Sequence, residues 1–160
     1  MFRIGIGYDV HQLAAGVPLV VGGVSLPWPK GLAGHSDGDV MLHAIMDALL
    51  GAAALGDIGT HFPDKDPQYK GCSSRMLLSR VSEKLTAAGY AVNNVDCTLV
   101  AQRPKVASYV PEMREKISQT LGVSVEQVNV KATTTEHLGF AGREEGMACY
   151  AVCTLKPLSS

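Results

Sequence analysis

The sequence predicts an α+β domain in which helices cover one face of a mixed four-stranded sheet, with a small β-hairpin beside it. The composition, 46% hydrophobic and 18% charged over 160 residues, is typical of a globular protein, and we expect a single domain over residues 1–160. Apolar and polar residues alternate, as in strands, near the start, middle and end of the chain. These segments do not alternate strictly with helical ones, which argues against a doubly wound parallel sheet.

The N-terminal part of the chain predicts a strand and then a hairpin. Residues 2–7 alternate between apolar and other side chains, which indicates a strand. Two short apolar segments, residues 19–21 and 24–26, are separated by two glycines, and a two-glycine turn is typical of a β-hairpin. Pro27 and Pro29 should end the strand pairing, because proline lacks the N–H that a sheet requires.

The first helix should follow residues 36–39, where a serine precedes an acid by three positions, the spacing of a helix N-cap. Residues 39–55 are rich in Ala, Leu and Met, and Gly56 follows at the place where glycine commonly ends a helix. Residues 61–71 contain two prolines and several charges, so we expect a mobile surface loop there.

The second half of the chain predicts two more helices and two more strands. Ser73 or Ser74 should cap a helix that ends at Gly89, and residues 91–102 alternate as a strand. Pro111 should open a third helix, which Gly122 closes. A capping-box sequence at residues 124–127 then precedes a strand at 128–133, a polar loop at 134–146 and a last strand at 147–155.

Charge and cysteine content limit the classes of partner and compartment. The net charge of −1 provides no broad basic surface, so we expect no binding to nucleic acid or to a membrane. The low charged fraction indicates that a partner subunit covers part of the surface. None of the four cysteines forms a Cys-x-x-Cys pair, and the N-terminal residues lack the basic and apolar segments of a signal peptide. The longest apolar stretch is too short and polar to span a bilayer, so we expect a cytoplasmic protein.

Asp9, His11 and His43 are candidate ligands of a metal ion. Asp9 and His11 are two positions apart, so on a strand both side chains point to one face. His43 lies early in the first predicted helix and can approach them from above. One carboxylate and two imidazoles suit Zn²⁺ with a vacant fourth position, which is characteristic of a catalytic site. The alternative is a surface Asp-x-His without a partner and a His43 that is simply buried in the core.

Five other segments carry polar groups that could bind an anionic or hydroxylated ligand. His35 and Ser36 precede a helix N-terminus, which attracts phosphate, and the alternative is ordinary capping of the helix by Ser36 or Asp37. Acidic residues in 55–59 and 62–66 could receive sugar hydroxyls or simply be solvated turns. Residues 101–105 follow a strand and are basic, and residues 131–136 combine three threonines with an acid, which suits phosphate and a divalent cation. The alternative is a solvated strand end for residues 101–105 and a Thr-rich strand end for residues 131–136.

Together these segments resemble the 2-C-methyl-D-erythritol 2,4-cyclodiphosphate synthase family of non-mevalonate isoprenoid (terpenoid) biosynthesis. The resemblance runs in order from about residue 3 to residue 155 and rests on several long motifs. These are GYDVH from residue 7, HSDGDV followed by His43, LGDIG from residue 55, FPD with Asp66 and Pro67, and VKATTTE with LGF and GR from residue 130 to residue 143.

The resemblance implies a reaction and a set of ligands. The family converts 4-diphosphocytidyl-2-C-methyl-D-erythritol 2-phosphate to a 2,4-cyclodiphosphate and CMP, as a cyclising phosphorus–oxygen lyase. By position, Asp9, His11 and His43 would hold one Zn²⁺ per subunit, and Glu136 would help to hold Mg²⁺ or Mn²⁺ at the substrate diphosphate. His35 and Thr134 would stabilise the transition state.

The resemblance also implies where the substrate binds. The methylerythritol phosphate would contact Ser36, Asp57, Ile58, Gly59, Phe62, Pro63, Asp64, Lys65 and Asp66. The remaining substrate-binding residues, which would contact the cytidine and the phosphates, are Ala101, Gln102, Arg103, Pro104, Lys105, Val106, Ala107, Thr133, Thr135, Phe140 and Arg143.

The family is a homotrimer whose sheets face the three-fold axis and whose active sites lie at subunit interfaces. The cytidine pocket would therefore come from the neighbouring subunit. Some members hold an isoprenoid diphosphate in an apolar channel on the axis, with an Arg at its mouth that Arg143 matches. This chain departs from the family at Tyr150, where other members often carry an acid.

Two other functions would use the same residues differently. A zinc phosphohydrolase would activate water at the open metal position and release inorganic phosphate or a linear product. A structural-zinc protein that binds nucleotide would normally have four Cys or His ligands, whereas the metal residues here number three.

Overall fold

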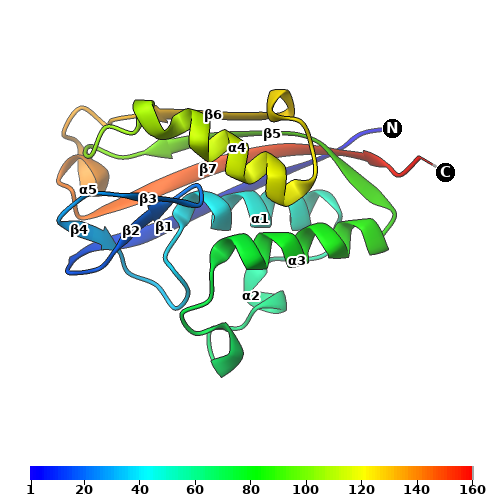
Figure 1. Cartoon of the computed structure of the whole chain (residues 1–160), viewed down its shortest axis with the longest axis horizontal. Coiled ribbons are helices and arrows are strands. Elements are labelled where there is room, and N and C mark those ends of the chain that lie inside the picture. Colours follow the sequence, from blue (N-terminus) through cyan, green and yellow to red (C-terminus); the bar gives the residue numbers. More distant parts are fainter. Residues whose placement is uncertain (160) are drawn as a thin grey trace.

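The computed structural model describes residues 1–159, which fold into one mixed sheet, a separate hairpin and a layer of helices (Figure 1). The sheet has the strand order β4-β1-β7-β5-β6. The longest strands, β1 (Arg3–Ala15) and β7 (Gly146–Pro157), are neighbours in the sheet. β5 (Tyr90–Val100) lies next to β7, and β6 (Val128–Thr133) forms the edge beyond β5. Within residues 1–159 no helix is long and apolar enough to cross a membrane.

The sheet is mixed, as the sequence predicts. β1 pairs antiparallel with β7, β7 pairs antiparallel with β5, and only β5 and β6 run parallel. The predicted count of four strands is wrong, because β4 (Lys30–Leu32) adds a fifth strand antiparallel to the end of β1. With three residues and prolines just before it, β4 shows no alternation and is formed by its tertiary pairing alone.

The predicted hairpin is confirmed residue for residue. β2 (Leu19–Val21) pairs with β3 (Val24–Leu26) across a turn at Gly22 and Gly23, both of which have positive φ angles. Glycine reaches this backbone region without steric cost, so the sequence alone determines the turn.

Three helices cover one face of the sheet (Figure 1). α1 (Val40–Ala52) packs on β1 and β7, α3 (Ser74–Ala87) packs on α1, and α4 (Val110–Leu121) packs on β6 and α3. The core between these layers is almost entirely aliphatic, and α1 is buried nearly all round. This burial explains why α1 carries His43 into the interior instead of presenting it to solvent.

The ends of α1 differ from the prediction. Its N-cap is Asp39 rather than Ser36 or Asp37, because the fully buried Asp39 carboxylate accepts hydrogen bonds from the amides of Leu42, Gly22 and Gly23 at 3.0, 2.9 and 2.7 Å. The contact with the hairpin turn thus selects the cap. The helix ends at Ala52, before the predicted Leu55, because Ala54 takes a left-handed conformation and closes a C-terminal turn.

The first strand is much longer than the predicted residues 2–7, because β1 continues to Ala15 by pairing with β7 and then with β4. The other predicted elements are close to the observed ones. α3 follows Ser73, α4 ends at Gly122 in a left-handed conformation, and the capping box at residues 124–127 is present. Two predicted loops contain short helices that the sequence does not signal, α2 (Ile58–His61) and α5 (Gly139–Gly142). Short 3₁₀ turns also occur at Pro67–Tyr69 and Ala107–Tyr109.

The face of the sheet opposite the helices is apolar and exposed. On β1, Ile4 and Ile6 are 72% and 70% exposed, and Tyr8 and Val10 are each 45% exposed. Tyr150 on β7 stacks beside Tyr8, with ring centroids 4.9 Å apart. Alternating residues of β1 therefore have opposite environments, since Gly7, Asp9 and His11 face the helices.

Close contact between β1 and α1 depends on two glycines. A Cβ atom on Gly5 would overlap the backbone carbonyl oxygen of Ala48, and one on Gly7 would overlap that of Ala44. The absence of side chains at these positions lets α1 lie directly on β1. The next helix-facing residues along β1 are Asp9 and His11, so this contact brings His43 within reach of both.

Candidate functional site

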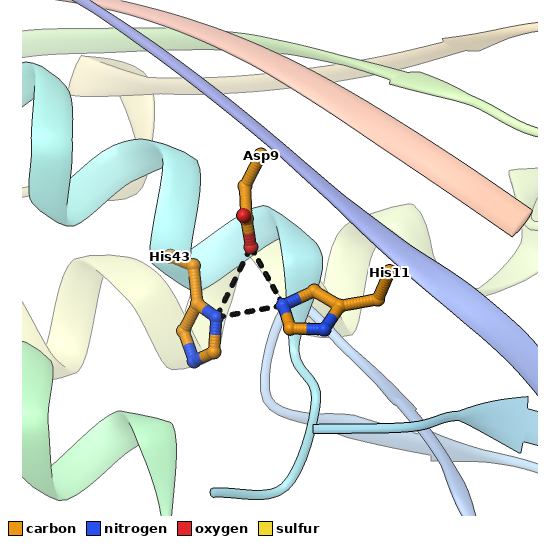
Figure 2. A group of neighbouring side chains, drawn as sticks. All are labelled: Asp9, His11 and His43. Atoms are coloured by element: carbon orange, nitrogen blue, oxygen red, sulfur yellow. Dashed lines mark hydrogen bonds and ion pairs between the residues drawn. The ribbon is translucent and has the colours of Figure 1, made fainter. Parts of the chain in front are cut away.

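Asp9, His11 and His43 converge on one point between β1 and α1, as the metal hypothesis predicts (Figure 2). Asp9 Oδ2 lies 2.8 Å from His11 Nε2 and 3.1 Å from His43 Nδ1, and the two ring nitrogens are 3.1 Å apart. The alternative of a partnerless Asp-x-His is wrong, because these side chains contact one another.

The donor set fits a divalent ion. Donor atoms around tetrahedral zinc lie roughly 3.4 Å apart, given bonds of about 2.0–2.1 Å. The three observed separations of 2.8–3.1 Å are slightly shorter, so a small outward movement of the side chains accommodates the ion. Within residues 1–159 this is the only group of three such ligands, and three ligands leave a fourth position open.

Each imidazole has a fixed partner on the nitrogen that points away from the group. His11 Nδ1 lies 2.8 Å from the carbonyl oxygen of Ala33, which can only accept, so this nitrogen carries the proton. His43 Nε2 lies 2.9 Å from Ser74 Oγ and 3.0 Å from Ser36 Oγ. The two rings therefore present different nitrogens, Nε2 of His11 and Nδ1 of His43, to the same point.

The pKa shifts show that Asp9 remains ionised at the centre of the group. Burial by itself raises the pKa of the Asp9 carboxyl, but hydrogen bonds from His11 and His43 outweigh burial and lower the pKa to about 2. Burial likewise lowers the pKa of His11, while the hydrogen bond and charge of Asp9 raise it above its ordinary value overall. A divalent ion that replaces the proton would gain the same attraction to the Asp9 charge.

The metal group opens into a cavity of about 280 Å³. Its wall contains most of the residues predicted for the metal and the methylerythritol phosphate. They are Asp9, His11, His35, Ser36, His43, Ile58, Gly59, Phe62 and Asp64, together with the unpredicted Gly34, Met46, Tyr69 and Leu77. His35 Nε2 is buried and has no hydrogen-bond partner, so it is a donor or acceptor left for a ligand.

The segment from residue 57 to residue 66 is held beside this cavity by local carboxylates. Asp57 caps α2 by accepting from the amide of Thr60 at 2.9 Å, and Asp47 of α1 accepts from the amide of Ile58 at 2.8 Å. Asp66 caps the Pro67–Tyr69 turn. Asp57, Pro63, Lys65 and Asp66 do not line the cavity, so their predicted substrate contacts stay predictions.

A second cavity of about 450 Å³ lies at the ends of β5 and β6. The predicted cytidine residues that line it are Ala101, Gln102, Pro104, Lys105, Val106, Ala107, Thr133 and Thr134. Leu99, Val110, Lys131 and Ala132 complete the wall. Because β5 and β6 run parallel, their carboxyl ends meet at one edge and bring two distant sequence segments together.

Besides Asp57, Pro63, Lys65 and Asp66, five further predicted site residues line neither cavity. Arg103 forms a bidentate ion pair with Glu144, at 2.9 and 3.1 Å, and lies over the ring of Trp28, while Arg143 pairs with Glu145 at 3.1 Å. Thr135 Oγ1 donates to the carbonyl oxygen of Leu138. Phe140 and Glu136 also lie outside both walls.

The two cavities share no residue, which separates the predicted catalytic groups in a single chain. His35 lines the first cavity and Thr134 the second, and Glu136 is not among the residues gathered around Asp9. Glu136 and His137 both have positive φ angles of 54° and 65°, a strained arrangement for residues with side chains. In one chain, the predicted metal and methylerythritol part of the site therefore lies in the first cavity, and the predicted cytidine part lies in the second.

Sequence reasoning missed the residues that hold the metal ligands in place. Ser74, Asp37 and Ala33 support the two imidazoles, but Asp37 and Ser74 were predicted only as helix caps and Ala33 carries no polar side chain. The signal for Ser74 was its place beside Ser73, since two serines before a helix leave one free for another contact. No local pattern indicates Ala33, because it acts through its backbone carbonyl.

Comparisons with known proteins place the chain in a family. The model of the YgbB family matches residues 2–156. The chain is 64% identical to a 2-C-methyl-D-erythritol 2,4-cyclodiphosphate synthase of Desulforamulus reducens, with 96% of this chain and 98% of the relative covered. It is 61% identical to the protein of the same name from Geobacter sulfurreducens, with 96% and 98% covered.

Solved structures show the same fold. IspF of Plasmodium falciparum in its CDP complex has a TM-score of 0.87 at 33% identity, with 99% of this chain and 97% of that chain covered. The bifunctional IspDF of Campylobacter jejuni has a TM-score of 0.96 at 42% identity, and 99% of this chain matches 43% of that longer one. With its metal-ligand cluster and both cavities on this fold, the chain belongs to the YgbB family, together with the 2-C-methyl-D-erythritol 2,4-cyclodiphosphate synthases that it matches over almost its whole length.

Proposed function

We propose that this protein converts 4-diphosphocytidyl-2-C-methyl-D-erythritol 2-phosphate to 2-C-methyl-D-erythritol 2,4-cyclodiphosphate and CMP. An oxygen of the 2-phosphate attacks the β-phosphorus, the bond from that phosphorus to the oxygen of the cytidine-bound phosphate breaks, and CMP leaves with the bonding electrons. The identity of 64% to a synthase of this name over nearly the whole chain supports the assignment.

The observation that carries this function is the open Asp9–His11–His43 group in the wall of a cavity. Joining two anionic phosphates is opposed by about 4 kcal/mol per charge pair at 4 Å and an effective dielectric constant near 20. A chain of net charge −1 cannot offset that repulsion in bulk, so local cationic groups are required. A Zn²⁺ held by the three side chains would supply a Lewis acid that polarises the β-phosphate.

The other residues of the first cavity would position the substrate. The unpartnered Nε2 of His35 is available to the reacting phosphate, and its burial strengthens any hydrogen bond that it makes. Ser36, Gly59 and Asp64 line the same wall and would contact the methylerythritol phosphate. No strong general base is needed, because a phosphate oxygen is already ionised at neutral pH.

The residues of the second cavity would bind the cytidine end. Its apolar residues and backbone groups suit a flat base, and Lys105 and the hydroxyls of Thr133 and Thr134 suit phosphate. The solved Plasmodium falciparum relative is a complex with CDP, which supports a cytidine ligand for this fold. Glu136, near this cavity in sequence, would hold Mg²⁺ or Mn²⁺ at the diphosphate.

A homotrimer would join the two cavities. The exposed apolar face of β1 and β7 needs a cover, and the reacting groups His35 and Thr134 line separate cavities in one chain. Placing this face on a three-fold axis would bury the apolar strands and bring the second cavity of one subunit to the first cavity of the next. An isoprenoid diphosphate on that axis is a further expectation, with Arg143 at its mouth.

Phosphorus NMR of the purified protein with the diphosphocytidyl substrate, Zn²⁺ and Mg²⁺ tests the function. We expect CMP and a cyclic diphosphate in equal amounts, and no turnover after chelation of the metals. Inorganic phosphate or a linear product would show that water reaches the metal, and the zinc phosphohydrolase would then be the better description. A metal-loaded protein without any turnover would leave only nucleotide binding.

A further inference from the structure

The imidazole of His43 is held by a chain of hydrogen bonds on the side away from the metal group. Nδ1 faces Asp9 and His11 at 3.1 Å, so it must carry a lone pair if it is to bind a metal ion. A neutral imidazole has one protonated and one unprotonated nitrogen, so Nε2 then carries the proton. Nε2 donates to Ser74 Oγ at 2.9 Å, with Ser36 Oγ at 3.0 Å as a second acceptor.

The direction of these bonds is set by Asp37. The Ser74 hydroxyl donates to Asp37 Oδ1, and the Ser74 backbone amide donates to Asp37 Oδ2 at 2.9 Å. A carboxylate can only accept, so the hydroxyl proton of Ser74 points to Asp37 and its lone pairs remain for His43. Ser74 is fully buried, which excludes water as a replacement acceptor.

Asp37 is itself fixed by the fold. It accepts from the amide of Asp39 at 3.1 Å, just before α1, and from the first residue of α3. Ser73 occupies the N-cap position of α3 but makes no side-chain cap, so the carboxylate of Asp37 takes that role from another segment. One carboxylate thus holds the starts of α1 and α3 together around His43.

The two imidazoles are therefore oriented by different means. His11 donates to the backbone carbonyl of Ala33, which no substitution can remove. His43 donates to a hydroxyl that a single substitution deletes without altering any of the three metal-binding side chains. This difference makes the contribution of the supporting bond measurable.

We propose that Ser74 and Asp37 are positioning residues that fix the Nε2–H tautomer of His43 and thereby set the affinity of the Asp9–His11–His43 site for a divalent metal ion. The inference rests on the metal assignment of the proposed function and extends it to residues that touch neither metal nor substrate. Loss of such a supporting partner typically lowers metal affinity by about 10- to 100-fold.

The first measurement is the affinity for Zn²⁺, determined on metal-free protein by competition with a chromophoric chelator. We expect Ser74→Ala and Asp37→Asn to bind Zn²⁺ about 10- to 100-fold more weakly than the wild type. Ser73→Ala is the matched control, because Ser73 is the adjacent serine and makes no side-chain cap. Ser74→Thr restores the hydroxyl and should recover most of the affinity.

The second measurement is the tautomer of His43, read from the ¹⁵N chemical shifts of histidine-labelled, metal-free protein. We expect the wild type and Ser73→Ala to show a protonated Nε2, and Ser74→Ala to shift towards the form in which Nε2 is unprotonated and Nδ1 donates its proton to Asp9. A purely structural role would lower the melting temperature without changing this signature. Ser118→Ala, at another buried serine, measures that general cost.

The outcomes distinguish failure of the positioning role of Ser74 from failure of the metal assignment. Unchanged affinity and an unchanged tautomer in Ser74→Ala would overturn the positioning role while leaving the metal site intact. A wild type that binds no Zn²⁺ would overturn the metal assignment, whereas the tautomer measurement would still report on Ser74. If Ser74→Ala does not fold, Asp37→Asn gives the same test, because it removes the charge that orients the hydroxyl.

Discussion

At the scale of single residues, the proposed metal site consists of one acid between two imidazoles. Asp9 Oδ2 lies within 3.1 Å of a ring nitrogen of both His11 and His43, and each histidine is neutral when it binds a metal ion. Without a metal ion, hydrogen bonds from the two imidazoles outweigh burial and lower the pKa of Asp9, and the same carboxylate outweighs burial and raises the pKa of His11. Proton and metal therefore compete for one site.

His43→Ala should abolish both bound zinc and turnover while the protein stays folded. The substitution removes one of three ligands, and a two-ligand site binds Zn²⁺ far more weakly. Zinc content by atomic emission, turnover by phosphorus NMR and circular dichroism would measure the three effects. Turnover at the wild-type rate in this variant would contradict the metal assignment. His61→Ala is a suitable control, because His61 lies outside the wall of the metal cavity.

Acid should destabilise the metal-free protein partly through Asp9. The folded-state pKa of Asp9 is lowered from 3.8 to about 2, so its stabilisation is present above the unfolded value and is lost as the pH falls towards 2. The loss amounts to about 2 kcal/mol between about pH 5 and pH 2. Urea unfolding across this range should show it as a difference between wild type and Asp9→Asn.

The raised pKa of His11 has the opposite sign. Its stabilisation is complete below pH 6.5, the unfolded value, and is lost as the pH rises through the folded value. The Asp9–His11 pair therefore stabilises the metal-free protein most in the window between the two unfolded values, 3.8 and 6.5. If the wild type and Asp9→Asn lost stability in parallel on acidification, this assignment would be wrong.

At the scale of elements, the decisive contact is that between β1 and α1. Gly5 and Gly7 lie against the carbonyl oxygens of Ala48 and Ala44, so the strand and helix backbones touch. Asp9 and His11 continue the same face of β1, and His43 precedes Ala44 on α1. The distance between these two elements therefore sets the size of the metal site.

Gly7→Ala should disturb both stability and metal binding. The new Cβ overlaps the carbonyl of Ala44, and crowding of this kind costs typically about 1–3 kcal/mol. We expect a lower free energy of unfolding and weaker Zn²⁺ binding, because α1 must move away from β1. Urea unfolding and chelator competition would measure the two effects.

Gly51→Ala, on α1, is the matched control. A Cβ at Gly51 meets nothing within 4 Å, so this substitution should stabilise the helix by about 0.5–1 kcal/mol. Equal effects of the two substitutions would show that the contact between β1 and α1 does not position the site.

At the scale of the whole molecule, one face of the sheet is covered by helices and the other is bare. The exposed residues on the bare face include Ile4, Ile6 and Val10 of β1 and Val152 of β7. We propose that this apolar surface forms the interface between the subunits of the homotrimer. It also accounts for the low charged fraction of the sequence.

Ile6→Glu should give a monomer that keeps its zinc but loses turnover. Ile6 is 70% exposed in the single chain, and burying a carboxylate there would oppose association. The metal group faces the helices and should be unaffected. Sedimentation equilibrium, zinc content and phosphorus NMR would measure mass, metal and activity.

Met76→Glu controls for the added charge, since Met76 is an exposed apolar residue of α3 outside the bare face. A monomeric wild type, or a fully active monomer of Ile6→Glu, would contradict the proposal that two subunits form each active site.

The sequence by itself determined the elements with strong local signals and the motifs of the family. The Gly22–Gly23 hairpin, the helix that ends at Gly122 and the capping box at residues 124–127 depend on backbone preferences of a few adjacent residues. The three candidate metal ligands, which the structure brings together, were also predictable, because their spacing on a strand and a helix and the resemblance point to the same residues.

Only the tertiary structure decided how these residues are supported. Asp39 became the cap of α1 because the hairpin turn donates to its carboxylate, and β4 formed because the end of β1 was free to pair. Ser74 and Asp37 hold His43 from segments 31 and 6 residues away in the chain. Contacts of this kind depend on packing between distant segments, and no local pattern of side chains encodes them.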